Sequence, residues 1–518
     1  MTFQFRLLLT LLVLTFAAPA EFTAAESSAE LLQELIEEAW EFSLEESPLL
    51  ATAVGDHRAN DRIDVVSVAD ADRRAAKKEG YLKRLQKIDR DALVGSDRIN
   101  YAVFERSLED DLVEYSFKTY LTPISNRSGF HIEFPELRRE VPLITTRDYE
   151  NYIARLAALG KYTDQHITLM REGMRQGYTL SSVIMEGCQE SIEVHVVDEP
   201  ERSLMYEPLA EIATSVPAAE HERLCEAARE AIRTSVVPGY KRFLEFMNSE
   251  YLPNCRGTVA ARALPKGQEF YRHRVRKFTT LDDATPEAVH QRGLEEVARI
   301  RGEMEAIIRR VGFEGDFQAF VEHLRNEPKF YAATPDELLK ECSYTLKRID
   351  GELPKLFNRL PVMPYGLRPV PDYIAPKTTS AYYQRPAGDG TRAGFYYLNT
   401  YNLPSRPLYM LEALSLHEAV PGHHLQIALQ QELEDLPEFR KFSGFTVFIE
   451  GWALYSERLG LEVGFYEDPH SDFGRLSMEI WRACRLVVDP GLHYLGWTRE
   501  QAIEYMSTNS AMSAPNIR

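Results

Sequence analysis

The stretch Leu414–Gln426, "LSLHEAVPGHHLQ", gathers three histidines and a glutamate within eight residues. It is similar to the His-Glu-x-x-His pattern, in which two histidines four residues apart lie on one helix face and bind zinc. Here Pro421 stands where the second histidine belongs, and His423 and His424 follow His417 by six and seven residues. In a regular helix seven residues rise about 10.5 Å, whereas one zinc ion needs each nitrogen at about 2.0–2.1 Å. A regular helix therefore cannot make this stretch a zinc site.

The dipeptide Pro421-Gly422 predicts that the helix is not regular. Proline removes a backbone donor and clashes with the preceding turn, and glycine permits unusual dihedral angles. Together they can loop two extra residues out of the helix, and such bulges often mark functional sites. Since Gly422-His423 reproduces the Gly-His pair common in the ordinary pattern, we expect His423 to be the second ligand beside His417. A bulge one residue longer would make His424 the ligand instead.

A third ligand is expected from the following helical segment, "FTVFIEGWALYSERLG". Glu450 follows His417 by thirty-three residues, which leaves room for a loop and a returning helix. Its neighbours are largely apolar, and a carboxylate in such a setting is costly unless it is paired or bound to a metal. Glu457, seven residues later on the same face, is predicted to support the site or to lie on the surface. The alternative is that the adjacent histidines only cap or pack a helix end.

Helix signals dominate the rest of the chain, so the predicted fold class is mainly α. A short aromatic segment, "GFYYLNT" at residues 394–400, is the best strand candidate, and we expect a peptide to pair with it as an added strand. The Pro-rich segment Leu360–Pro376 could join two lobes, approximately residues 21–376 and a metal-site lobe at 377–518, or could be a loop within one domain. Predicted helix N-caps are Ser28, Thr285, Thr334 and Thr498, the last forming a capping box with Gln501.

The composition of the 518 residues excludes several classes of protein. Hydrophobic content of 44% and charged content of 27% are ordinary for a soluble globular chain. A net charge of −19 repels phosphate backbones, so no nucleic-acid partner is expected. The five cysteines are widely spaced without a C-x-x-C pair, which argues against a zinc finger or a redox motif. Buried free thiols are expected, although an exported chain could also form a disulfide.

The first twenty residues, "MTFQFRLLLTLLVLTFAAPA", have the pattern of a secretory signal peptide. One basic residue precedes an apolar run that is too short to span a bilayer comfortably, and Ala18-Pro19-Ala20 fits the cleavage site. No cysteine follows the run at the place that a lipid anchor would need, and no later segment is apolar and long enough to span. We therefore expect an exported protein, periplasmic or extracellular, with no membrane span after signal removal.

The chain resembles a bacterial family catalogued as domain of unknown function 885. The resemblance rests on "HEAVPGHHLQ", "FIEGWALYSERLGLEVGFYED" and "RLVVDPGLHYLGWTREQAIEYM", and it covers much of Ala381–Met506. It implies a large helical peptidase-like fold around a central cleft, related to zinc peptidases. It also implies a peptide substrate, with the release of dipeptides from C-termini reported for some members.

Carried onto this sequence, the resemblance implies one Zn²⁺ per chain held by His417, His423 and Glu450, with Glu418 as the general base. An oxyanion formed during hydrolysis needs a hydrogen-bond donor, for which His493 and Tyr397 are candidates, with Tyr494 beside them.

Family members usually continue beyond the segment that ends at Met506, whereas this chain ends at Arg518 in "STNSAMSAPNIR". From this difference we expect a shortened C-terminus. The alternative function is therefore a catalytically impaired or non-catalytic peptide-binding remnant of the same fold.

Overall fold

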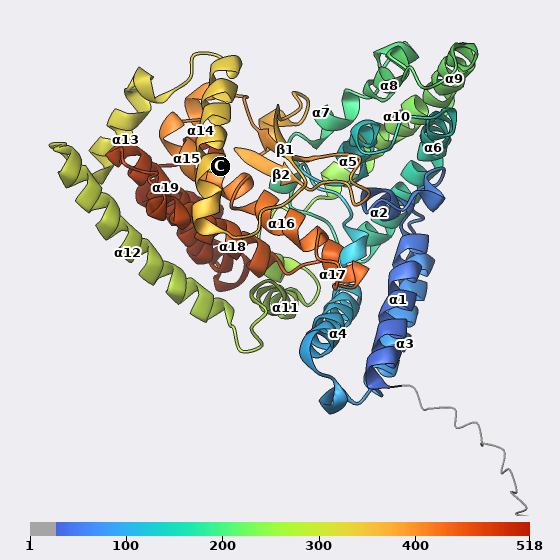
Figure 1. Cartoon of the computed structure of the whole chain (residues 1–518), viewed down its shortest axis with the longest axis horizontal. Helices are drawn as coiled ribbons and strands as arrows, with labels where there is room; N and C mark the ends of the chain where they lie inside the picture. Colours follow the sequence, from blue (N-terminus) through green and yellow to red (C-terminus); the bar gives the residue numbers. More distant parts are fainter. Residues whose placement is uncertain (1–26, 518) are drawn as a thin grey trace, which may run out of the picture.

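The computed structural model describes residues 27–517, and its helices form two lobes with a small sheet between them (Figure 1). The predicted mainly α fold class is confirmed. The predicted signal peptide, residues 1–20, lies outside the described residues. No helix within residues 27–517 combines the length and the apolar character that a bilayer crossing requires.

The N-terminal lobe, residues 27–254, is built from long helices that bury apolar stripes against one another. Its largest core lies between α6 and α10, and a smaller core lies among α1, α3 and α4. The larger core also encloses three histidines that are no more than 5% exposed, which are His131, His166 and His195. The main helices are α1 (Ser28–Glu46), α3 (Val68–Leu85), α4 (Gly95–Ser116), α6 (Thr146–Arg175), α9 (Ala218–Ala231) and α10 (Val237–Phe246).

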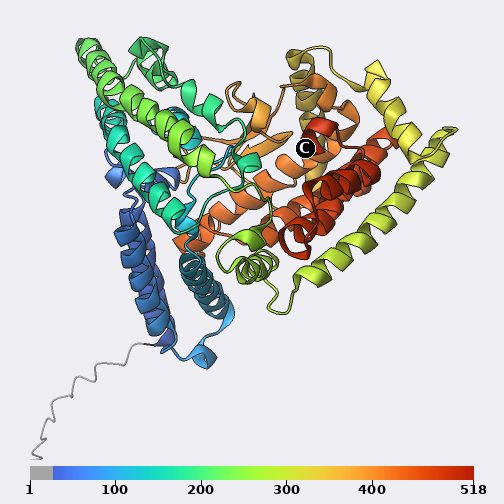
Figure 2. The ribbon, with the colours of Figure 1, turned by 180° about the vertical axis from the view of Figure 1, so that it is seen from behind.

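The C-terminal lobe begins at α12 (Pro286–Val311), which lies along α19 (Pro469–Pro490) in the views from both sides (Figures 1 and 2). The connecting helix α11 (Gly267–Thr279) stands between the lobes. One hydrophobic core joins α12 and α14 (Pro335–Leu356) to the elements that follow residue 380. The predicted lobe boundary near residue 376 is therefore wrong, because the apolar faces of α12 and α14 pack within the C-terminal lobe rather than on the N-terminal one.

The sheet has three strands in the order β1-β3-β2. The strands are β1 (Tyr365–Pro369), β2 (Ala381–Gln384) and β3 (Gly394–Leu398). The central strand β3 confirms the predicted β element, while β1 shows that the Pro-rich segment is part of the sheet. Since β3 pairs with a neighbour on each side, it has no free edge, and the prediction that a peptide adds to it is wrong. The free edge nearest the site belongs to β2.

Local signals place most helix ends correctly. Thr285, Thr334 and Thr498 are N-caps, and the capping box of Thr498 with Gln501 forms as predicted. The first helix starts one residue earlier than predicted, because the hydroxyl of Ser27 rather than Ser28 accepts from the backbone of the third helical residue. All five cysteines are free thiols in the structure.

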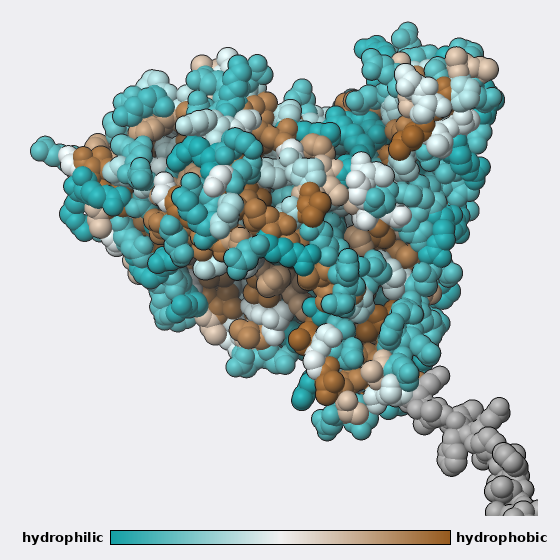
Figure 3. Space-filling view, in the orientation of Figure 1, coloured by the Kyte–Doolittle hydropathy of each residue, from teal (hydrophilic) through white to brown (hydrophobic). Residues whose placement is uncertain are grey.

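The two lobes touch through both apolar and polar contacts, and Phe439 of the C-terminal lobe packs edge-on against Phe104 with ring centroids 5.6 Å apart. Gln384 donates to Glu140 at 3.0 Å, and Arg440 donates to Asn100 at 2.9 Å. Figure 3 shows that hydrophilic residues cover most of one face, while hydrophobic residues gather near its centre. The site described next lies in the C-terminal lobe, beside the edge strand β2.

Candidate metal centre

The helix that carries the opening motif is interrupted, not merely bulged. α15 (Leu411–Glu418) ends directly after His417, and α16 (His423–Gln431) begins at the next histidine pair. Between them Ala419 and Gly422 leave the helical region of backbone angles. A side chain on Gly422 would meet the carbonyl oxygen of His417 at 1.9 Å, so only glycine permits this close return of the chain. The indole of Trp452 donates to the carbonyl of Pro421 at 2.7 Å and holds the connection in place.

This interruption brings His423 back to His417. Their rings lie 4.7 Å apart, and the carboxylate of Glu450, on α18 (Thr446–Leu459), faces both imidazoles. Glu450 Oε2 lies 3.6 Å from His417 Nε2, and its Oε1 lies 3.8 Å from His423 Nε2. Three potential ligand atoms therefore lie within 4.8 Å of one another. The structure brings together the three residues that the sequence proposed as ligands.

Glu450 is nevertheless not buried as its apolar sequence neighbours suggested. Its side chain is 55% exposed, since the first turns of α18 stand at the surface. The imidazole of His417, 3.6 Å away, lowers the pKa of Glu450 to about 2, so its carboxylate is ionised. The argument from an apolar setting was wrong, but the carboxylate still faces the histidines.

A buried carboxylate lies behind His417. Glu457, 1% exposed, has its Oε1 2.8 Å from His417 Nδ1, and Arg482 of α19 donates to the same oxygen at 2.9 Å. Burial disfavours the imidazolium, but the nearby carboxylates of Glu450 and Glu457 outweigh it and raise the pKa of His417 to about 9. A carboxylate on the far nitrogen orients a metal-binding histidine and presents its other nitrogen to the ion. Of the two predicted places for Glu457, the structure selects the supporting one.

His424 points away from the cluster, although it is adjacent to His423. Its Nε2 donates to the carbonyl of Met363 at 3.0 Å, so its Nδ1 accepts from the hydroxyl of Tyr383 at 2.8 Å. Both ring nitrogens are therefore committed to other partners. The geometry favours His423 over His424 as the second ligand atom.

Glu418 lies next to this cluster and lines the same cavity of about 410 Å³. The residue is 7% exposed, and burial raises the pKa of its carboxyl to about 7. A carboxyl with a pKa near neutrality can both take up and return a proton at physiological pH. The position and the acidity of Glu418 both fit a general base.

Four further residues of the cavity escaped the sequence analysis, namely Tyr383 of the edge strand and the arginines Arg385, Arg482 and Arg485. They place positive charge around a cavity in a chain whose net charge is −19. The positions of these residues in the sequence do not show which distant segments they meet, so no sequence signal pointed to them.

The two predicted oxyanion donors do not line this cavity. His493 accepts from the backbone N–H of Ala261 at 3.1 Å, near the end of α19. Tyr397 is 2% exposed and stacks on Tyr382 at 4.7 Å in a small core under the sheet. Tyr494 stacks on Tyr271 beside His493, also outside the cavity. Each of these side chains already has a packing role where it lies.

Comparison with known proteins agrees with the motifs. The family described as "Bacterial protein of unknown function (DUF885)" matches residues 48–518. The chain belongs to this family. No curated protein matches the chain.

Two solved structures are similar to it. One, from Colwellia psychrerythraea, is described as a "putative lipoprotein"; it is 26% identical, with a TM-score of 0.88 over 95% of this chain and 88% of that one. The other, from Shewanella oneidensis, is described as a "putative lipoprotein of unknown function"; it is 17% identical, with a TM-score of 0.64 over the same shares, and supports the fold alone.

Proposed function

We propose that this protein is an exported zinc-dependent peptidase that hydrolyses short peptides. The observation that carries the proposal is the convergence of His417, His423 and Glu450 beside the buried carboxyl of Glu418, in one cavity. Two imidazoles and one carboxylate are the protein ligands of several catalytic zinc sites, which keep a fourth position open.

The residues present fit a zinc ion. Donors at about 2.0–2.1 Å from a tetrahedral zinc ion lie roughly 3.3 Å apart. The two oxygens of Glu450 lie 3.6 and 3.8 Å from the two imidazole nitrogens, and the three ligand atoms lie within 4.8 Å of one another, so the side chains would draw closer together around one ion. When bound, zinc would polarise a peptide carbonyl and lower the pKa of water toward neutrality.

The chain's own groups supply the proton transfers and the charge. Glu418 would accept a proton from the attacking water and return it to the leaving amine, as its pKa of about 7 allows. Arg485 lines the cavity and makes no ion pair or hydrogen bond within residues 27–517, unlike Arg482, which is held by Glu457. Its guanidinium is the group best placed among these arginines to offset negative charge that develops on a substrate.

The edge strand β2 offers a place for an extended peptide. The N–H of Asn399 donates to the carbonyl of Ser380, so these two residues form a hydrogen-bonded pair. Because such pairs alternate in an antiparallel ladder, the backbone N–H groups of Ala381 and Tyr383 point away from β3. Both residues line the cavity. A peptide that adds to this edge would lie across the metal centre, with its backbone paired to the protein.

Export is part of the proposal for two reasons. Residues 1–20 have the pattern of a signal peptide, and two proteins of similar structure are described as lipoproteins in the quoted terms. Localisation of the full-length chain by fractionation of the producing cells tests this point.

The central experiment measures zinc and turnover together. Protein purified without chelators should carry about one zinc per chain, as one three-ligand site implies. Glu418→Gln should keep that zinc and lose peptide hydrolysis, because an amide cannot accept the proton. Metal content near zero after incubation with zinc would overturn the proposal, while zinc without turnover in the parent would favour the non-catalytic alternative.

A further inference from the structure

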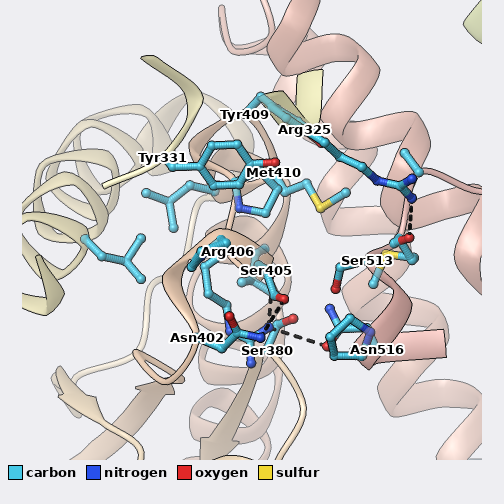
Figure 4. A pocket seen from close by; sticks show the side chains of 18 of the residues that line it. Arg325, Tyr331, Ser380, Asn402, Ser405, Arg406, Tyr409, Met410, Ser513 and Asn516 are labelled. Carbon is cyan, nitrogen blue, oxygen red and sulfur yellow. Dashed lines mark hydrogen bonds between the residues drawn. The ribbon is translucent and has the colours of Figure 1, made fainter. Parts of the chain in front are cut away.

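A second cavity, of about 400 Å³, includes Ser380, the residue just before β2, in its lining (Figure 4). Its walls come from the segment around residues 402–411, from α14, and from the C-terminal segment around residues 511–516. Figure 4 shows Arg406, Asn402, Ser405 and Asn516 together on one wall, with Tyr331 and Tyr409 on the opposite one. Ser513 lies between these walls. The cavity is separate from the metal ligands, none of which lines it.

The unusual group in this cavity is the guanidinium of Arg406, a residue that is only 7% exposed. Its Nε donates to the carbonyl of Asn399 at 3.0 Å, and its Nη1 donates to the carbonyl of Ser405 at 3.1 Å and to Asn516 Oδ1 at 3.5 Å. Its Nη2 has no hydrogen-bond partner within residues 27–517. No carboxylate of those residues lies within 4.0 Å of this guanidinium.

A buried cation without a counter-ion is costly, and proteins normally pair it. Arg138, which is 6% exposed, follows this rule and forms ion pairs with Glu136 and Glu207 at 2.7 and 2.6 Å. Within residues 27–517 the hydrogen-bond partners of Arg406 are all neutral carbonyl groups, and burial lowers its pKa. Its free Nη2 and its position on a cavity leave room for an anion to supply the missing charge.

The neighbouring groups indicate what kind of anion fits. The hydroxyl of Ser513 is buried without a hydrogen-bond partner, so a donor suited to a carboxylate oxygen is available on the same cavity. A second arginine of the lining, Arg325, donates to the carbonyl of Met512 at 2.8 Å and lies 3.9 Å from the carboxylate of Glu322, so its charge is already opposed. The rest of the lining is largely apolar, including Leu338, Leu411 and Met410. One free guanidinium edge balances one negative charge, and the aliphatic walls favour an apolar group next to it.

We propose that this cavity binds a small monocarboxylate with an apolar body, and that the carboxylate takes its hydrogen bonds from Arg406 Nη2 and the hydroxyl of Ser513. The ligand could be a free acid or the end of a peptide, because both present the same carboxylate. The cavity shares four lining residues with the metal cavity, which are Ser380, Leu414, Met478 and Met512. A peptide antiparallel to β2 would direct its C-terminus toward Ser380, and hence toward Arg406; this second source alone rests on the proposed function.

The test compares N-acetyl-L-leucine with its neutral isostere N-acetyl-L-leucinamide by titration calorimetry on the full chain. A charge-assisted hydrogen bond predicts that the acid binds about 10- to 100-fold more tightly than the amide. Arg406→Gln should remove this preference for the acid over the amide. Ser513→Val should weaken the binding of the acid about 5- to 10-fold. Arg348→Gln is the matched control, because Arg348 pairs with Glu412 at 2.9 Å outside this cavity.

The titration is carried out on both zinc-loaded and EDTA-treated protein, so that it does not depend on the metal centre. Equal binding of acid and amide to the parent chain would overturn the proposal, as would an undiminished preference in both cavity variants. If Arg406→Gln fails to fold, the parent ligand pair and Ser513→Val still decide the matter. Competitive inhibition of peptide hydrolysis by the acid would identify the peptide end as the source, and binding without inhibition would identify a free acid.

Discussion

Replacing Glu457 by glutamine should weaken zinc binding by about 10- to 100-fold. The carboxylate of Glu457 lies 2.8 Å from His417 Nδ1 and is 1% exposed, so water cannot replace it. A hydrogen bond to a charged group is worth about 1.5–3 kcal/mol, and each 1.4 kcal/mol is a tenfold change in affinity. Partners of metal-binding histidines have effects of the same size, about 10- to 100-fold. The amide keeps the shape of the side chain, so the loss should come from charge alone.

A competition titration of the metal-free protein with a chromophoric zinc chelator measures the effect. Glu412→Gln serves as the control, because Glu412 is also a largely buried carboxylate on the same lobe but pairs with Arg348 and Ser471 instead of an imidazole. Its zinc affinity should match that of the parent. If Glu457→Gln binds zinc as tightly as the control, the carboxylate does not support His417 and the argument from geometry fails.

Three further predictions address the ligand, the substrate edge and acid stability. His423→Ala should lose zinc during dialysis while His424→Ala retains most of it, and the reverse pattern would make His424 the ligand. Ala381→Pro removes an outward N–H of β2 and should raise KM with little change in melting temperature; an unchanged KM would place the peptide elsewhere. Each of the three buried histidines of the N-terminal lobe should lower the free energy of unfolding by about 2 kcal/mol at pH 5. Their folded pKa values lie below that of unfolded histidine, so the unfolded chain binds more protons as the pH falls below about 6.5. For His166, burial lowers the pKa to about 3, and urea unfolding of His166→Leu should show a smaller loss between pH 7 and pH 5 than the parent.

Much of the local structure was predictable because its causes lie within a few residues. Threonine before proline begins α12 and α14, since the hydroxyl caps the first turn and proline needs no backbone donor there. The Pro421-Gly422 pair predicted a break in the helix because proline and glycine act on the backbone right beside them. The break also brings His423 to face His417, because the chain returns over a glycine that has no room for a side chain.

Other features depend on which distant segments meet, and no local pattern carries that information. The apolar sequence neighbours of Glu450 were the wrong reason to choose it. The burial of a side chain depends on which helices pack around it and not on the residues adjacent in the sequence. His493 and Tyr397 belong to chemically suitable residue types, yet packing holds them away from the cavity.

The sequence by itself determined the helical class, most helix ends, and the residue types of the candidate metal centre, because hydrogen bonding and backbone sterics act within one or two turns. Only the tertiary structure decided that Glu457 contacts His417, that β2 and not β3 is an edge strand, and that Arg406 is buried with no carboxylate of residues 27–517 beside it. Each of these depends on contacts between segments far apart in the chain, where the balance of desolvation against pairing is set by the complete fold.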